Sequence, residues 1–190
     1  MKEQIIERIQ ASVHLKQRLL EDTSLIKRLE LAIDLICDAF GRGRRVYFCG
    51  NGGSAADAQH LAAELTGRFY KNRRALPAEA LHCNSSYLTA MANDFSFDDI
   101  YAHLVEGLMQ PGDVLVGLTT SGNSENMVKA FEKAKERGID TIGFTGESGG
   151  KIKFSATILI NVPSIETPRI QECHILLGHI LCEFVESRLF

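Results

Sequence analysis

His60 and Glu64 are a pair of residues whose types and spacing could do chemistry. They lie four residues apart in a stretch that predicts a helix over residues 54–66, so both side chains stand on one helical face. Such a pair can supply two metal ligands, or a general base and the group that orients it. A solvent-exposed ion pair explains the same spacing, and the pair alone leaves these interpretations open.

A glycine-rich loop directly precedes that helix. Gly50-Asn51-Gly52-Gly53-Ser54 follows a short apolar run over residues 45–49. Glycines let a backbone approach a ligand closely, and the amides that open a helix favour an anion. The G-x-G-x-x-A pattern from Gly50 to Ala55 also matches a dinucleotide fingerprint, but no acidic residue stands about 20 positions later. The loop therefore favours a phosphate over a dinucleotide, with a tight turn capped by Ser54 as the structural alternative.

A second loop is rich in hydroxyl and amide side chains. Thr119-Thr120-Ser121-Gly122-Asn123-Ser124 follows an apolar run over residues 113–118 and opens another predicted helix. Hydroxyls and helix-end amides can surround a phosphate without a lysine, whereas no G-x-x-x-x-G-K-[ST] motif indicates ATP or GTP turnover. A polar loop capped by Ser124 is the structural alternative. Two such loops in one chain favour a small phosphorylated ligand.

The elements that must position these loops alternate regularly from residue 44 onward. Apolar runs predict five strands, over residues 45–49, 79–82, 113–118, 141–145 and 157–162. Between and after them, helical patterns cover residues 54–66, 86–109, 124–137 and 167–189. This alternation predicts an α/β fold with a doubly wound five-stranded parallel sheet flanked by helices. Ligands of such sheets bind at the carboxyl ends of the strands, where both loops lie.

Residues 1–43 predict a pair of amphipathic helices ahead of the first strand. Asp22 or Thr23 is the expected N-cap of the second helix, and Gly41 ends it. The apolar positions recur at helical spacing, at Ile5, Ile6, Ile9, Val13, Leu25, Leu29, Ile33, Ile36 and Phe40. The pair can pack on its own domain or on another subunit. We predict one domain over residues 1–190, with the helical pair at 1–43 and an α/β core at 44–190.

The composition excludes several classes of protein. A net charge of −3, from 21 basic and 24 acidic residues, gives no basis for binding nucleic acid or an anionic membrane. No apolar run is long enough to span a bilayer, and the N-terminal MKEQIIERIQ is too charged for a signal peptide. The five cysteines are scattered without a C-x-x-C motif. We expect a reduced, cytoplasmic protein without nucleic-acid or membrane partners.

The last predicted helix carries a further candidate pair. Gln171 and His179 are eight residues apart, so their directions differ by about 80° and both can face one site. His174 lies about 140° from His179 by the same arithmetic and is not expected to share it. His174 and the remaining histidines at positions 14, 82 and 103 are expected on the surface, in the core or at an interface.

Three segments together resemble the sugar isomerase (SIS) family: residues 50–60, 119–124 and 167–172. Their combination with His60, Glu64, Gln171 and His179 is most similar to the phosphoheptose isomerases of that family, over essentially the whole chain. The resemblance implies a SIS-type fold and a homotetramer with active sites between subunits. It also implies conversion of sedoheptulose 7-phosphate into D-glycero-D-manno-heptose 7-phosphate, the first step of bacterial ADP- or GDP-heptose synthesis.

The resemblance also implies roles for individual residues. Glu64 would be the base and His179 its acid/base partner in an isomerisation through an enediol. One zinc ion per subunit would be bound by His60, Glu64, Gln171 and His179. Contacts to the sugar phosphate would come from Asn51, Gly52, Gly53, Ser54, Arg68, Asn93, Asp94, Thr119, Thr120, Ser121, Ser124 and Gln171. Whether Glu64 is a metal ligand, a free base or each in turn stays open.

A non-enzymatic branch of the same family provides the alternative function. Its members associate with the bacterial replication initiator and use a SIS tetramer as a binding platform. The resemblance implies that this branch loses the counterparts of Glu64 and His179, both of which are present here. The C-terminal run over residues 181–190 is nevertheless similar to that branch.

Overall fold

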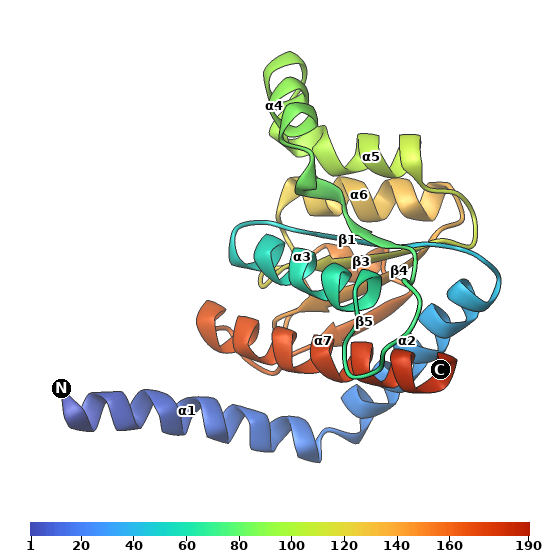
Figure 1. Ribbon diagram of the computed structural model, residues 1–190. Coiled ribbons are helices and arrows are strands. Elements are labelled where there is room, and N and C mark those ends of the chain that lie inside the picture. Colours follow the sequence, from blue (N-terminus) through green and yellow to red (C-terminus); the bar gives the residue numbers. More distant parts are fainter.

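The computed structural model describes all residues from 1 to 190 and has a five-stranded parallel sheet as its centre (Figure 1). The strand order is β2-β1-β3-β4-β5. The strands are β1 (Val46–Gly50), β2 (Ala78–Ala80), β3 (Val114–Leu118), β4 (Asp140–Thr145) and β5 (Ile158–Asn161). The chain reverses its direction of winding between β1 and β3, where Gly50 pairs with Leu118. The two polar loops therefore leave neighbouring strands at the switch point of the sheet, the usual place for a ligand.

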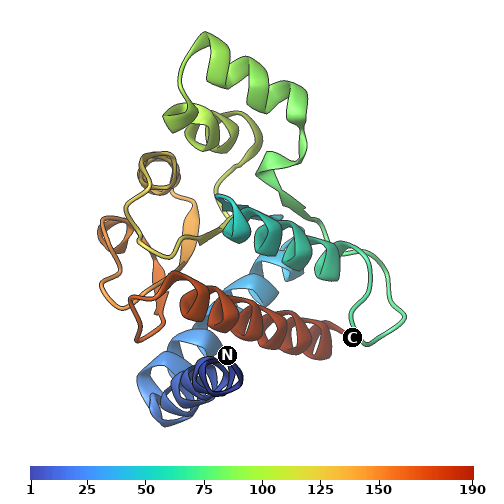
Figure 2. The same ribbon diagram turned by 90° about the vertical axis from the view of Figure 1, so that its left-hand side faces the viewer.

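Helices cover both faces of the sheet (Figures 1 and 2). One face packs against α2 (Thr23–Gly41), α3 (Gly53–Thr66) and α7 (Thr167–Leu189). The other packs against α5 (Ile100–Leu108) and α6 (Glu125–Glu136). Alternate residues of β1, such as Phe48 and Tyr47, enter opposite cores, as the pleat of a strand requires.

The N-terminal pair consists of α1 (Lys2–Glu21) and α2, and Asp22 rather than Thr23 caps the second helix. The Asp22 carboxylate accepts a hydrogen bond of 2.8 Å from the amide of Leu25. The second half of α1 buries Leu15 and Leu19, while its first half runs beside the start of α7, where Arg169 donates a hydrogen bond of 3.1 Å to the Arg8 carbonyl (Figure 1). None of the helices combines the length and the apolar character needed to cross a membrane.

The prediction of one helix over residues 86–109 is wrong. α4 covers Ser85–Asp94, a short turn follows at Phe97–Asp99, and α5 begins at Ile100. The chain leaves helical geometry at Phe95, and the Ser96 hydroxyl accepts a hydrogen bond of 3.1 Å from the Asp98 amide. A serine that satisfies the amides of a new turn favours a helix start over continuation, so the apolar periodicity on both sides belongs to two helices.

Candidate functional site

The glycine loop forms the tight junction between β1 and α3. Gly52 is the N-cap and has a φ of +55°, a conformation that favours glycine. A Cβ on Gly50 would lie 2.5 Å from the carbonyl oxygen of Ser54, so only glycine fits there. The Tyr101 hydroxyl of α5 donates to the Gly50 carbonyl and fixes the end of β1. Since α3 begins at Gly53, Ser54 lies within its first turn and is not the N-cap that the structural alternative assigned to it.

The hydroxyl loop, residues 119–124, keeps donor groups available for a ligand. Two of its hydroxyls accept backbone hydrogen bonds, Thr119 from the Gly122 amide at 3.3 Å and Ser121 from the Asn123 amide at 3.1 Å. Each of these hydroxyls keeps its own proton to donate. Ser124 is the N-cap of α6, as in the structural alternative, but its side chain makes no capping hydrogen bond. The loop can therefore donate several hydrogen bonds to an anion.

A reciprocal pair of amides joins the two loops. Asn51 donates to Asn126 at 2.8 Å and accepts from it at 2.9 Å. Asn126 lies in the first turn of α6 and only 1% of it is exposed. The pair ties the N-terminus of α3 to that of α6, and both termini favour a bound anion. Asn51, which was predicted to contact the sugar, thus uses its amide to position the loops, and the sequence analysis missed Asn126.

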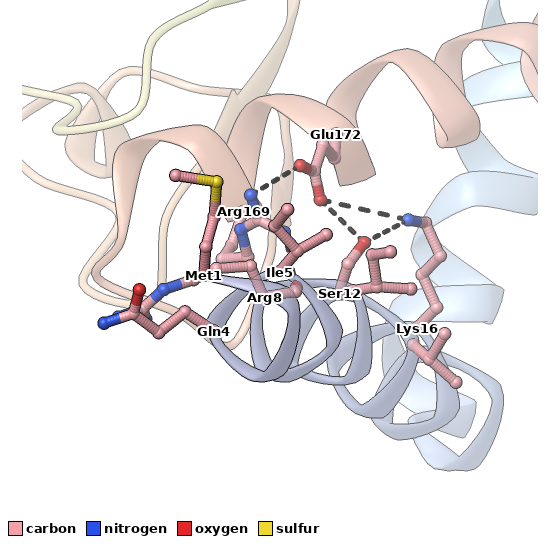
Figure 3. A pocket seen from close by; sticks show the side chains of 10 residues that line it. Met1, Gln4, Ile5, Arg8, Ser12, Lys16, Arg169 and Glu172 are labelled. Carbon is pink, nitrogen blue, oxygen red and sulfur yellow. Dashed lines mark hydrogen bonds and ion pairs between the residues drawn. The ribbon is translucent and has the colours of Figure 1, made fainter.

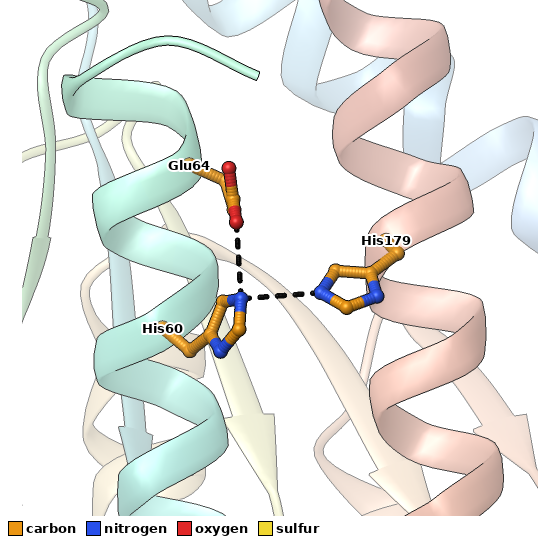
Figure 4. Close-up of side chains that lie close together, drawn as sticks. All are labelled: His60, Glu64 and His179. Atoms are coloured by element: carbon orange, nitrogen blue, oxygen red, sulfur yellow. Dashed lines mark hydrogen bonds and ion pairs between the residues drawn. The ribbon is translucent and has the colours of Figure 1, made fainter. Parts of the chain in front are cut away.

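His60, Glu64 and His179 converge between α3 and α7 (Figure 4). His60 Nε2 lies 3.0 Å from Glu64 Oε1 and 3.2 Å from His179 Nε2. One ligand atom from each residue lies within 4.8 Å of the others. The structure therefore joins the helix pair His60–Glu64 to His179, which lies more than a hundred residues away in the sequence.

A glycine explains how α7 comes so close to α3. A Cβ on Gly178 would lie 2.5 Å from Cδ1 of Leu61, and Leu61 is almost fully buried. Each of these two residues directly neighbours a member of the cluster, since Leu61 follows His60 and Gly178 precedes His179. The absence of a side chain at Gly178 thus sets the helix separation at the point where the two histidines meet.

The three side chains fit a zinc ion. With zinc–ligand distances of about 2.0–2.2 Å, tetrahedral ligand atoms lie about 3.3 Å apart, close to the 3.0 and 3.2 Å that separate His60 Nε2 from Glu64 and His179. His60 Nε2 also faces a carboxylate oxygen and another ring nitrogen at once, and a cation satisfies all three lone pairs where one proton cannot. Nitrogen and oxygen ligands suit zinc.

Gln171 lies against the glycine loop at the start of α3. A Cβ on Gly53 would come within 2.8 Å of Nε2 of Gln171, so the glutamine amide lies against the glycine loop. Gly53 precedes His60 by about 10 Å along α3. Gln171 is therefore beside the predicted phosphate loops, and its role as a fourth metal ligand stays a prediction.

Asp57 is a member of this site that sequence reasoning missed. It lies on the same face of α3 as His60 and Glu64, at positions i, i+3 and i+7. Burial raises the pKa of the Asp57 carboxyl above its usual value, while His60 and His179 act in the opposite direction. The spacing could have identified it.

Three other predicted site residues are exposed and lie outside the cluster: Arg68, Asn93 and Asp94. Asn93 donates a hydrogen bond of 2.8 Å to Asp94 at the end of α4. α4 packs on α5 and lies at the opposite end of the molecule from α7 in both views (Figures 1 and 2). A single chain therefore does not bring Asn93 and Asp94 to His60.

His174 is a core residue, in agreement with the sequence analysis. It is fully buried, and its Nε2 lies 3.1 Å from the carbonyl oxygen of Thr145. Burial lowers its pKa to about 4, so the ring is neutral at physiological pH.

Comparison with known proteins agrees with the fold. A family model for the SIS domain matches residues 10–146, and the chain belongs to the SIS-domain family. Phosphoheptose isomerase from Clostridium acetobutylicum is 47% identical over 190 residues, covering 100% of this chain and 97% of that protein. The one from Aquifex aeolicus is 57% identical over 153 residues, 80% of each chain.

Solved structures give the same grouping. Phosphoheptose isomerase from Neisseria gonorrhoeae superposes with a TM-score of 0.91 at 41% identity over 98% of both chains. The one from Francisella tularensis superposes with a TM-score of 0.93 at 32% identity over 97% of both chains. Within the SIS-domain family, the chain belongs to the phosphoheptose isomerases. The predicted fold and the resemblance are confirmed.

Proposed function

We propose that the protein converts sedoheptulose 7-phosphate into D-glycero-D-manno-heptose 7-phosphate. The observation that carries this proposal is the convergence of Glu64 and His179 on α3 and α7, beside a helix whose first turn adjoins two phosphate-type loops. The relatives named phosphoheptose isomerase, which match the chain over almost its full length, support the same reaction.

The chain's own residues can carry the proton transfers. Glu64 removes a proton from C1 of the ketose while His179 protonates the carbonyl oxygen on C2 from Nδ1, since its Nε2 faces His60, and this gives an enediol. Glu64 then returns its proton to C2, and the hydroxyl on C1 loses a proton to His179, which leaves an aldehyde at C1. Glu64 contacts His60 through Oε1, so Oε2 is the oxygen that takes the carbon-bound proton. One carboxylate can thus hold a ligand position and act as base.

Zinc is the proposed cofactor, one ion per subunit. His60, Glu64 and His179 would hold it, with Gln171 as the predicted fourth ligand. When bound, it would supply a Lewis acid that polarises the oxygens on C1 and C2.

The phosphate would bind at the N-termini of α3 and α6. The donors there are the first amides of both helices and the hydroxyls of Ser54, Thr119, Thr120, Ser121 and Ser124. Gly52 and Gly53 let the backbone approach the phosphate closely, and Gln171 lies beside them. Arg68 would contact the sugar hydroxyls.

A homotetramer is the proposed assembly, because the first half of α1 leaves apolar side chains uncovered within the chain. Ile5, Ile9 and Val13 are each more than half exposed. They border a groove of about 600 Å³ between α1 and the start of α7 (Figure 3). Arg169 and Glu172 of α7 close its floor through an ion pair of 2.8 Å. Other copies of this chain would cover this apolar surface.

Active sites shared between subunits follow from the position of α4. The resemblance assigns sugar contacts to Asn93 and Asp94, yet α4 lies at the far end of the molecule from α7 (Figure 1). A neighbouring subunit's α4 would supply these contacts. We place the reaction in the cytoplasm, as the first step of heptose supply for lipopolysaccharide, capsule or a surface-layer glycan. The alternative, a non-catalytic platform for the replication initiator, is not favoured because Glu64 and His179 meet at one site.

A coupled assay tests the proposal. Purified protein with zinc is mixed with sedoheptulose 7-phosphate, and formation of the aldoheptose phosphate is followed with and without a chelator. We expect turnover that the chelator removes and zinc restores. Absence of turnover with zinc supplied would refute the isomerase and favour the binding platform.

A further inference from the structure

The segment between α3 and β2, residues 67–74, is fastened to α7 by one buried carboxylate. Glu186, in the last turns of α7, is only 1% exposed. It accepts hydrogen bonds from three successive amides, Phe69 at 3.1 Å, Tyr70 at 2.7 Å and Lys71 at 2.9 Å. A fourth comes from Nε of Arg73 at 2.6 Å. Four donors converge on one side chain, so this segment has little freedom to move independently of α7.

Arg73 fastens the same segment to the end of α3. Its side chain is 1% exposed. Nη2 donates to the carbonyl oxygen of Glu64 at 2.9 Å, and Nη1 donates to those of Leu65 at 2.9 Å and Gly67 at 3.2 Å. These are carbonyls at the helix C-terminus that have no partner within the helix, and an arginine there also complements the helix dipole. The backbone of Glu64 is thereby tied through Arg73 to Glu186 on α7.

The segment over residues 67–74 also contacts His179, the proposed acid/base partner of Glu64. The ring of Phe69 lies 5.8 Å from the ring of His179, measured between centroids. Glu186 follows His179 by seven residues, two turns further along the same helical face. The ion pair between Arg73 and Glu186 therefore fixes the backbone of Glu64 on α3 and holds the Phe69 ring beside His179 on α7.

We propose that Arg73 and Glu186 form a positioning pair that sets the separation between Glu64 and His179. Neither residue touches the substrate. A buried ion pair is costly to desolvate and contributes little net stability compared with an apolar replacement. The position in which the pair holds α3 and α7 therefore explains its presence better than stabilisation does. The inference rests on the proposed isomerase, for which a displacement of about 1 Å at the reacting groups costs about 100-fold in rate.

The test uses Glu186→Gln, which keeps the shape of the side chain but removes its charge, and Arg73→Lys, which removes the fork of donors. We expect kcat to fall by about 10- to 100-fold and zinc affinity to fall by a similar factor. KM should change by less than about twofold, because the phosphate loops lie at the other end of α3. A loss of stability alone lowers the amount of active protein and leaves KM unchanged, so kcat is normalised to the folded fraction measured by circular dichroism.

The matched control is Arg74→Lys. Arg74 is the neighbouring residue and stacks over the Phe190 ring at 5.6 Å, as Arg73 does at 5.5 Å, but its guanidinium makes none of the bonds to α3. This control should behave as the wild type. Glu186→Gln and Arg73→Lys proteins that fold and retain wild-type kcat and zinc affinity would overturn the proposal.

Two further results keep the outcome interpretable. If Glu186→Gln and Arg73→Lys do not fold, Phe69→Leu is the variant to measure. It leaves the ion pair intact and removes the ring beside His179. An unchanged kcat in Phe69→Leu would then overturn the proposal. A wild-type protein without turnover would refute the proposed function, whereas the zinc affinities of the variants would still decide whether the pair positions Glu64 and His179.

Discussion

Gly178→Ala is the most direct perturbation of the distance between α3 and α7. The new Cβ would lie 2.5 Å from Cδ1, 2.8 Å from Cδ2 and 3.2 Å from Cγ of Leu61. Carbon atoms in contact lie about 3.5–4.0 Å apart, so Leu61 or α7 must move by about 1 Å. Since all three outer carbons of Leu61 are too close and the residue is buried, rotation of one methyl group does not relieve the contact.

The expected effect on stability is small, and the expected effect on the site is large. Overpacking costs about 1–3 kcal/mol, whereas replacing a helical glycine by alanine gains about 1 kcal/mol. The net loss is therefore about 0–2 kcal/mol. Metal ligands, however, must be placed within about 0.2 Å, so a shift of His179 relative to His60 lowers zinc affinity by about 10- to 100-fold and lowers kcat with it.

The assay measures zinc affinity by competition with a chelator, together with kcat and the free energy of unfolding. Gly107→Ala is the control, because Gly107 also lies in a helix but nothing is within 4 Å of its Cβ position. That variant should be slightly stabilised and bind zinc normally. Adding Leu61→Ala to Gly178→Ala should restore part of the zinc affinity. Wild-type zinc affinity in Gly178→Ala, with no energetic coupling to Leu61, would refute the reasoning.

Three further predictions concern catalysis, phosphate binding and pH. Glu64→Gln should lower kcat by at least about 100-fold without changing the oligomer measured by light scattering; retained turnover would exclude Glu64 as the base. Ser121→Ala and Ser124→Ala should each raise KM by about 10-fold with little change in kcat, and an unchanged KM would place the phosphate elsewhere. The folded-state pKa of His174, lowered to about 4, makes this residue stabilising above pH 6.5 and progressively less so down to pH 4. His174→Gln should therefore remove about 3 kcal/mol of the pH dependence of unfolding by urea in that range; an unchanged dependence would contradict this.

The parts of the fold that follow from local chemistry could be predicted from the sequence. The alternation of apolar runs and helical periods identified all five strands, and the glycines after β1 marked a junction that admits no other residue at position 50. The break at Ser96 is also local, since a serine followed by two aspartates is a helix-start signal. Apolar periodicity continues on both sides of it, and that pattern concealed the break.

The contacts that complete the site could not be predicted, because they join distant positions. Asn51 and Asn126 are 75 residues apart, and Arg73 and Glu186 are 113 residues apart. Nothing in the sequence near either partner specifies the other. In the sequence alone, Gly178 is a glycine that mildly destabilises the helix around it. Its role in the site follows only from the packing of Leu61 against it.

The geometry of α3 relates the two halves of the site to the length of the substrate. Ser54 and His60 are six residues apart, about 9 Å along the helix axis. Helical side chains lean toward the N-terminus, which brings the Glu64 carboxylate back to the level of His60, 3.0 Å from its ring. An extended seven-carbon sugar phosphate separates its phosphorus from C1 by about 10 Å, with an advance of about 1.25 Å per bond. With the phosphate at the first turn of α3, as proposed, C1 and C2 of a heptose would reach the level of Glu64 and His179, and those of a shorter sugar would end before it. The rise of this helix thus predicts a preference in chain length that neither loop could supply alone.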